Sequence, residues 1–195
     1  MKNHSISYIL VGLALVVLVT GYTLTREQQA LADKLVRLHV VANSDTDLDQ
    51  SVKLQVRDAV LEVTATLEPT ELEANLATIQ TVANETLSNL EQTDRAVVTL
   101  ERELFPTRDY DTFTLPAGTY TSLRVTIGEG TGHNWWCVVY PSLCLPATTA
   151  ELTETAMEAG LTQGEIALIT EQEPTYELKF KSLEWLETIQ AVLIN

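Results

Sequence analysis

Cysteine and basic residues are scarce in this chain of 195 residues, and each shortage excludes a class of protein. Two cysteines are too few for a zinc ribbon, an iron–sulfur cluster or a disulfide-dense small fold. Twelve lysines and arginines against 27 acidic residues give a net charge of −15. A surface of that charge repels nucleic acid and anionic lipid headgroups. Three histidines could supply one small metal site at most.

Catalytic motifs are also missing. The chain contains no G-x-S-x-G, no H-E-x-x-H and no convincing pair of carboxylates, so neither a metal nor a cofactor is predicted. One enzyme hypothesis stays open. In it, Cys137 is the nucleophile and His133 the base of a secreted peptidase or cell-wall hydrolase.

One long apolar run is present, at the amino terminus. No charge occurs between Lys2 and Arg26, and residues 6–24 are about long enough to span a bilayer as a helix. Residues 1–25 therefore indicate either a signal peptide or an uncleaved single-pass membrane anchor, since no A-x-A cleavage site is present. The basic residue before the run and the acidic bulk after it place the remainder outside the cytoplasm.

The rest of the chain predicts one extracytoplasmic α+β domain over residues 35–195, preceded by a polar tether over residues 26–34. Alternating and β-branched patterns predict strands over residues 35–42, 96–105, 123–127, 135–140 and 176–181. Three- and four-residue spacing predicts helices over residues 48–63, 69–90, 149–159 and 183–193.

These elements suggest a mainly antiparallel sheet covered by an α-helical hairpin, with a C-terminal helix. Leu48 is expected on the inward face of the first helix of the hairpin. The glycine-rich segment 128–134 is expected to join the strands on either side of it as a β-hairpin. The Glu-rich stretch before residue 176 is expected to be the least structured part.

Two tryptophans and then two cysteines follow the glycine-rich segment. Trp135 and Trp136 are neighbours on a predicted strand, so their side chains face opposite sides. Either one is buried and the other half covered, or one stays exposed as an anchor for a protein partner. Cys137 and Cys144 enclose a short loop, which in an oxidising compartment favours a disulfide over two buried thiols.

Two segments together resemble the signatures of the stage II sporulation protein R family. The first is R-L-H-V-V-A-N-S-D at residues 37–45, continuing through Lys53 to V-R-D-A-V at residues 56–60. The second is G-H-N-W-W-C-V-V-Y-P-S-L-C at residues 132–144. Their order, their separation and the apolar amino terminus agree as well, and the resemblance covers residues 26–147.

The resemblance implies a signalling protein of endospore-forming bacteria, made in the forespore and exported into the space between the two septal membranes. There it would activate a membrane-embedded aspartic protease of the mother cell, which then cleaves a sigma-factor precursor. The expected partner is the extracytoplasmic face of that protease. The membrane itself would be contacted only through residues 1–25, if that segment stays uncleaved.

The candidate partner-binding residues fall in three groups. They are the turn Asn43, Ser44 and Asp45, the helical pair Arg57 and Asp58, and the loop Gly132, His133, Asn134, Trp135 and Trp136. The alternative is that these residues maintain the fold. Neighbours on a helix do not face each other, so Arg57 is expected to meet an acid in the turn over residues 43–49 and not Asp58.

Overall fold

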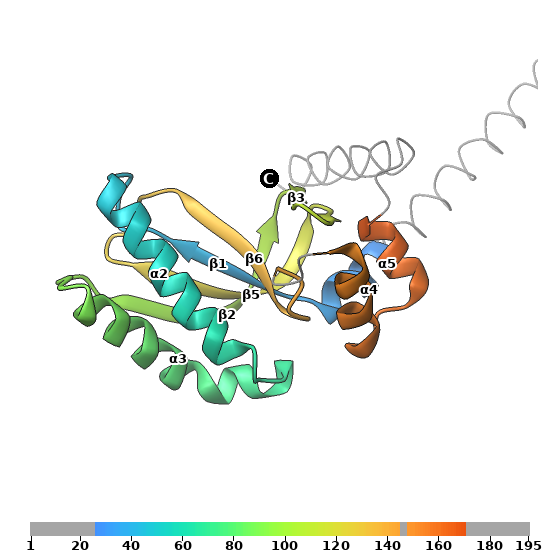
Figure 1. The fold of residues 1–195 in the computed structure, drawn as a ribbon, viewed down its shortest axis with the longest axis horizontal. Helices are drawn as coiled ribbons and strands as arrows, with labels where there is room; N and C mark the ends of the chain where they lie inside the picture. The colour runs from blue at the N-terminus through green and yellow to red at the C-terminus, as the bar shows by residue number, and fades with distance from the viewer. Residues whose placement is uncertain (1–25, 145–147, 171–195) are drawn as a thin grey trace, which may run out of the picture.

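The computed structural model describes residues 26–144 and 148–170. Its centre is a four-stranded sheet of strand order β2–β5–β1–β6 (Figure 1). The strands are β1 (Val36–Val41), β2 (Ala96–Phe105), β5 (Gly118–Ile127) and β6 (Asn134–Tyr140). The pairs β2–β5 and β1–β6 are antiparallel, while β1–β5 is parallel. The prediction of an α+β fold with a mainly antiparallel sheet is confirmed.

Two long helices, α2 (Asp47–Thr64) and α3 (Pro69–Asn89), lie side by side over one face of the sheet (Figure 1). Thr46 caps α2 by accepting a hydrogen bond from the amide of Asp49 (3.2 Å), and Pro69 stands in the first turn of α3, where its missing N–H is not needed. The helices and the sheet enclose one core, which contains Val52, Val56, Val60, Ile79, Ala83, Leu87, Leu38, Val40, Leu123 and Val125.

The prediction that Leu48 points inward is wrong, because its side chain is 61% exposed. The first turn of α2 packs against a polar turn of the chain and not against the sheet. Gln50, on that turn of the helix, donates a hydrogen bond to the carbonyl of Ser44 (2.9 Å). The apolar stripe of α2 therefore begins one turn later, at Val52.

The predicted hairpin between β5 and β6 is also wrong, because β1 lies between these two strands. β5 and β1 run parallel, so their carboxyl ends lie next to each other, where Val41 pairs with Thr126. The glycine-rich segment crosses the end of β1 before the chain returns as β6. It must span two interstrand spacings, about 10 Å, which a tight hairpin turn does not. β6 thus occupies an edge of the sheet.

A second core lies at the far end of the sheet, built from residues 26–34 and from short elements late in the chain. These are the ribbon of β3 (Arg108–Asp109) and β4 (Thr114–Leu115), α4 (Thr149–Glu158) and α5 (Gln163–Thr170). Leu31 and Phe105 are among its fully buried members.

Two expectations change as a result. Residues 26–34, expected to be a tether, are helical and contribute Leu31 and Ala32 to this core, and Lys34 forms an ion pair with Glu165 (2.7 Å). The segment is too short for its few apolar residues to show a helical period. The stretch expected to be least structured contains α5, whose Ile166 and Ile169 are buried.

The predicted strand at 176–181, the predicted helix at 183–193 and the signal or anchor segment at 1–25 lie outside the described residues. Within residues 26–144 and 148–170, no helix has the length and hydropathy needed to cross a membrane.

Candidate functional site

The turn after β1 and the glycine-rich segment form one surface, although they are 86 residues apart in the chain. Asn43 joins them. Its Oδ1 atom accepts a hydrogen bond from the amide of Glu129 (2.9 Å), and its carbonyl accepts from the amide (3.2 Å) and the hydroxyl (2.8 Å) of Thr131. The amide of Gly132 donates to the carbonyl of Ala42 (3.0 Å). Two of the three predicted groups are therefore brought together.

Two glycines make this contact possible. A Cβ atom on Gly132 would collide with the carbonyl oxygen of Ser44, which is backbone and cannot turn aside. Gly128 has a φ of +56°, and a Cβ atom there would collide with the side chain of Asn43. The loop thus needs glycine at one position for space and at the other for conformation as well.

The loop is held to the turn by Asp45 and to α2 by Lys53, and both residues bind His133 of the loop. One carboxylate oxygen of Asp45 accepts a hydrogen bond from the amide of His133 (2.6 Å) and lies 2.5 Å from its Nδ1 atom. The ammonium of Lys53 donates to the carbonyl of His133 (2.9 Å) and to the side chain of Gln50 (2.6 Å). Burial lowers the pKa of Lys53, and the charge of Arg57 lowers it further, against the opposing effect of Asp45.

Asp49 organises the turn from the side of the helix. Its Oδ2 atom accepts hydrogen bonds from the hydroxyl of Ser44 (2.5 Å) and the amide nitrogen of Asn43 (3.2 Å). The bond from Ser44 is the main reason that the pKa of Asp49 is lowered, and it outweighs the opposing effect of burial. The carboxylate is therefore engaged as an acceptor within the turn.

The two tryptophans point to opposite faces of β6, and both are half buried. Trp135 lies on the side of α2, where the guanidinium carbon of Arg57 is 4.6 Å from its ring centroid. Trp136 lies on the other side, between Arg108 (3.7 Å from guanidinium carbon to ring centroid) and the ring of His39 (5.5 Å between centroids). Each tryptophan thus carries an arginine on its ring.

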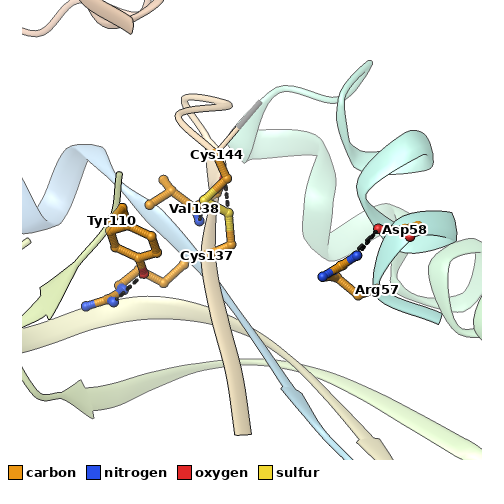
Figure 2. The surroundings of a disulfide bond; sticks show 7 residues. Arg57, Asp58, Tyr110, Cys137, Val138 and Cys144 are labelled. Atoms are coloured by element: carbon orange, nitrogen blue, oxygen red, sulfur yellow. Dashed lines mark hydrogen bonds and ion pairs between the residues drawn. A yellow bond between two sulfur atoms is a disulfide. The ribbon is translucent and has the colours of Figure 1, made fainter. Parts of the chain in front are cut away.

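The predicted partner of Arg57 is wrong. Arg57 forms its ion pair with the adjacent Asp58 (2.7 Å) and not with an acid in the turn over residues 43–49, as Figure 2 shows. Although the Cβ atoms of neighbours on a helix diverge, the long arginine side chain folds back far enough to reach the shorter carboxylate. The pair is exposed on the Asp58 side, whose side chain is 63% accessible.

Cys137 and Cys144 form a disulfide, which joins β6 to the loop that follows it (Figure 2). Their Cα atoms are 6.1 Å apart, within the range that a disulfide requires. Cys137 is fully buried, and the amide of Val138 donates to the sulfur of Cys144 (3.2 Å). The thiol that the hydrolase hypothesis needs is consumed by this bond, while its predicted base, His133, pairs with Asp45.

A polar network on the sheet face opposite α2 and α3 was not predicted. His39 is buried, and its Nδ1 atom lies 2.8 Å from a carboxylate oxygen of Glu103. The same carboxylate accepts hydrogen bonds from Arg124 (3.2 Å) and Ser122 (2.8 Å). The available signal was the alternation of Arg37 and His39 with Leu38 and Val40 in β1. Because alternate residues of a strand point to opposite faces, Arg37 and His39 lie on the face away from Leu38 and Val40 and need polar partners there.

No metal centre is found in the described part of the chain, where no three His, Cys, Asp or Glu side chains are grouped so that they could hold an ion. The acids around the turn are engaged instead by donors of the protein, as shown for Asp45 and Asp49.

Comparison with known proteins identifies the family. The family model of stage II sporulation protein R matches residues 32–150, which include both segments of the assembled surface. Stage II sporulation protein R of Bacillus subtilis (strain 168) is 31% identical to this chain over 185 residues, covering 82% of the chain and 83% of that protein. No solved structure matches. The chain belongs to the stage II sporulation protein R family, and its role is in sporulation.

Proposed function

We propose that this protein is an exported signal that activates a membrane-embedded aspartic protease of the mother cell, and that the active protease then processes a sigma-factor precursor. In this proposal the protein is made in the forespore and acts in the intermembrane space, either released or held by residues 1–25. The membership of the stage II sporulation protein R family carries the proposal.

The assembled surface supports a binding role. Hydrogen bonds to main-chain amides hold the Asn43–Asp45 turn against the Gly132–Asn134 loop. The contact is close, because a side chain at either of two glycine positions of the glycine-rich segment would collide with the turn. The Arg57–Trp135 contact adjoins this surface on the α2 side. A rigid surface loses little conformational freedom when a partner binds, which favours recognition. The disulfide also suits an oxidising compartment outside the cytoplasm.

Activation would follow from differential binding. A ligand shifts a conformational equilibrium only to the extent that it binds one state more tightly than the other. We infer that the protein binds the active, dimeric arrangement of the protease more tightly than the inactive one. The contact is made on the extracytoplasmic side, and no bond of the precursor is cleaved by the protein itself.

Reconstitution in a non-sporulating host tests the proposal. The full chain is co-expressed with the sporulation aspartic protease and the sigma-factor precursor, and cleavage is followed by immunoblot. We expect cleavage only when this protein is present, and none when a catalytic aspartate of the protease is replaced. Absence of cleavage with a folded protein and a protease shown to be competent would refute the proposal.

The same assay addresses the hydrolase alternative. A Cys137→Ser/Cys144→Ser variant lacks both sulfurs, so an enzyme that uses Cys137 as its nucleophile must lose all activity. A signalling protein loses only the stabilisation of a short disulfide loop, about 2.5 kcal/mol, and should still trigger cleavage at a temperature where it remains folded. Circular dichroism confirms the folded state in the same preparation.

A further inference from the structure

A shallow groove of about 420 Å³ lies where the assembled surface of turn and loop meets the face of β6 away from α2. It is lined by the loop residues from Thr131 to Asn134, by Asp45, and by Arg108 and Trp136. Because β6 is the edge strand of the sheet, the groove is open to an approaching partner. Among its lining residues, Arg108 is the arginine and Asp45 the carboxylate.

Arg108 has an unusual environment for a cation. Its guanidinium stacks on the ring of Trp136, and its Nε atom is buried without a hydrogen-bond partner. None of the ion pairs among the described residues includes Arg108.

The acids near Arg108 are engaged elsewhere. Asp109 accepts a hydrogen bond from the hydroxyl of Thr114 (2.9 Å), and Glu103 is bound by His39 and Arg124. Asp45, which also lines the groove, is held by the amide and the ring of His133. The groove therefore presents a guanidinium that forms no ion pair with an acid of the described residues.

A carboxylate fits this arrangement better than other ligands. A guanidinium that stacks on an aromatic ring is fixed in its plane and presents its N–H groups at its edge, where a carboxylate accepts two of them in parallel. Polyanions such as nucleic acid are disfavoured by the net charge of the whole chain.

We propose that this groove binds an Asp or Glu side chain from the extracytoplasmic part of the partner protease, with Arg108 as the anchor and Trp136 as the support that orients it. This inference rests on the proposed function for the identity of the partner. It adds the chemistry of the contact, an acidic side chain, and a residue that lies outside both sequence signatures.

The first test compares Arg108→Gln with Arg102→Gln in the reconstituted cleavage assay. Gln is polar but uncharged, and it removes the guanidinium that stacks on Trp136. Arg102 is a matched control, because it is a cation on β2 at the opposite edge of the sheet. It forms an ion pair with the exposed Asp33 and donates hydrogen bonds to the carbonyl of Thr119 and the hydroxyl of Thr121. We expect Arg108→Gln to need about tenfold more protein for half-maximal cleavage, and Arg102→Gln to behave as the wild type.

Thermal unfolding of each variant separates a binding defect from a folding defect. If Arg108→Gln melts well below the wild type, a charge swap gives the answer: Arg108→Glu is combined in turn with Arg at each acidic extracytoplasmic position of the protease. Rescue at one position supports the proposal. Cleavage by folded Arg108→Gln equal to the wild type, or no rescue at any position, overturns the proposal while leaving the proposed function intact.

A second measurement needs no protease and stands even if the wild type fails to trigger cleavage. The Nε–Hε NMR signal of Arg108 and the indole signal of Trp136 are followed in the full chain while N-acetylglutamate is added. We expect both signals to shift with saturation, and the signal of Arg102 to stay in place. An equal ionic strength of sodium chloride is the control. Shifts that are absent, or that sodium chloride reproduces, overturn the carboxylate site.

Discussion

At the scale of single residues, the surface depends on a few backbone-directed contacts. Asn43 uses its side chain and its carbonyl to hold the glycine-rich segment, and Asp45 accepts from the main chain of His133. These residues were predicted to bind a partner or to maintain the fold. Their hydrogen bonds join the turn to the loop, and the side chains of His133 and Asp45 are largely exposed. Partner binding by these residues stays a prediction.

Gly132→Ala tests the close approach. The new methyl group collides with the carbonyl of Ser44, so the loop must move away from the turn, and we expect a loss of about 1–3 kcal/mol in the free energy of unfolding. Urea unfolding measures this loss. Gly164→Ala is the control, because nothing lies within 4 Å of its added Cβ and alanine suits a helix better than glycine. Equal stabilities for the two variants would contradict the proposed packing.

The lowered pKa of Asp49 predicts a specific pH dependence. A carboxyl group whose pKa is lower in the folded protein than in the unfolded chain stabilises the fold above the unfolded pKa, about 3.9, and this contribution disappears as the pH falls through the folded value. We therefore expect Asp49→Asn to melt below the wild type at neutral pH, with the gap closing in acid.

Thermal unfolding at a series of pH values, from neutral to well below the unfolded pKa of about 3.9, checks this expectation. Asp47→Asn, in the same turn of α2, controls for the loss of a negative charge at the start of the helix. A gap for Asp49→Asn that stays constant through the acid range would show that its carboxylate does not stabilise the turn.

At the scale of elements, burial separates the residues that build the core between the helices and the sheet from those that only follow the apolar period of a helix. Ile79 in α3 is fully buried against the sheet, whereas Leu48 in α2 is largely exposed. Leu48 was predicted to point inward, because a sequence pattern shows the period of a helix and does not show where the packing of that helix against the sheet begins.

Ile79→Ala and Leu48→Ala make this difference measurable. Truncation of Ile79 leaves a cavity between α3 and the sheet, and we expect it to cost about 2–5 kcal/mol of unfolding free energy. Truncation of Leu48 removes a side chain already in water and should change stability by no more than about 0.5 kcal/mol. Chemical denaturation of both variants gives the comparison. A large loss for Leu48→Ala would mean that α2 packs differently at its start.

At the scale of the whole molecule, the proposed signal would act through a binding surface around β6. Three features adjoin one another around β6: the assembled surface of turn and loop, the Arg57–Trp135 contact and the Arg108 groove. An edge strand flanked by two arginine–tryptophan stacks offers a partner both shape and charge.

Charge reversal at Arg57 tests this surface. Arg57→Glu removes the cation over Trp135 and places a negative charge next to Asp58, so we expect cleavage in the reconstituted assay to fall by about tenfold or more. The melting temperature should fall only slightly, because an exposed ion pair and one cation–π contact contribute little. Arg102→Glu is the control for net charge. Loss of folding in parallel with loss of signalling would assign Arg57 to the fold alone.

The sequence was sufficient for features that depend on local pattern. The range of β2, the start of α3 at Pro69 and the placement of Trp135 and Trp136 on opposite faces follow from period and from proline geometry. It was insufficient where a contact lies between distant segments. The partner of Arg57, the packing of residues 26–34 and the stacking of Arg108 on Trp136 each depend on which element lies opposite.

The sequence by itself determined the fold class, the family and the main elements, because hydrophobic period and two local signatures are properties of neighbours in the chain. The tertiary structure alone decided that β1 lies between β5 and β6, that Asn43 holds the glycine-rich segment and that Arg108 faces an open groove. Strand order and side-chain pairing are set by the packing of the whole core, which no local pattern records.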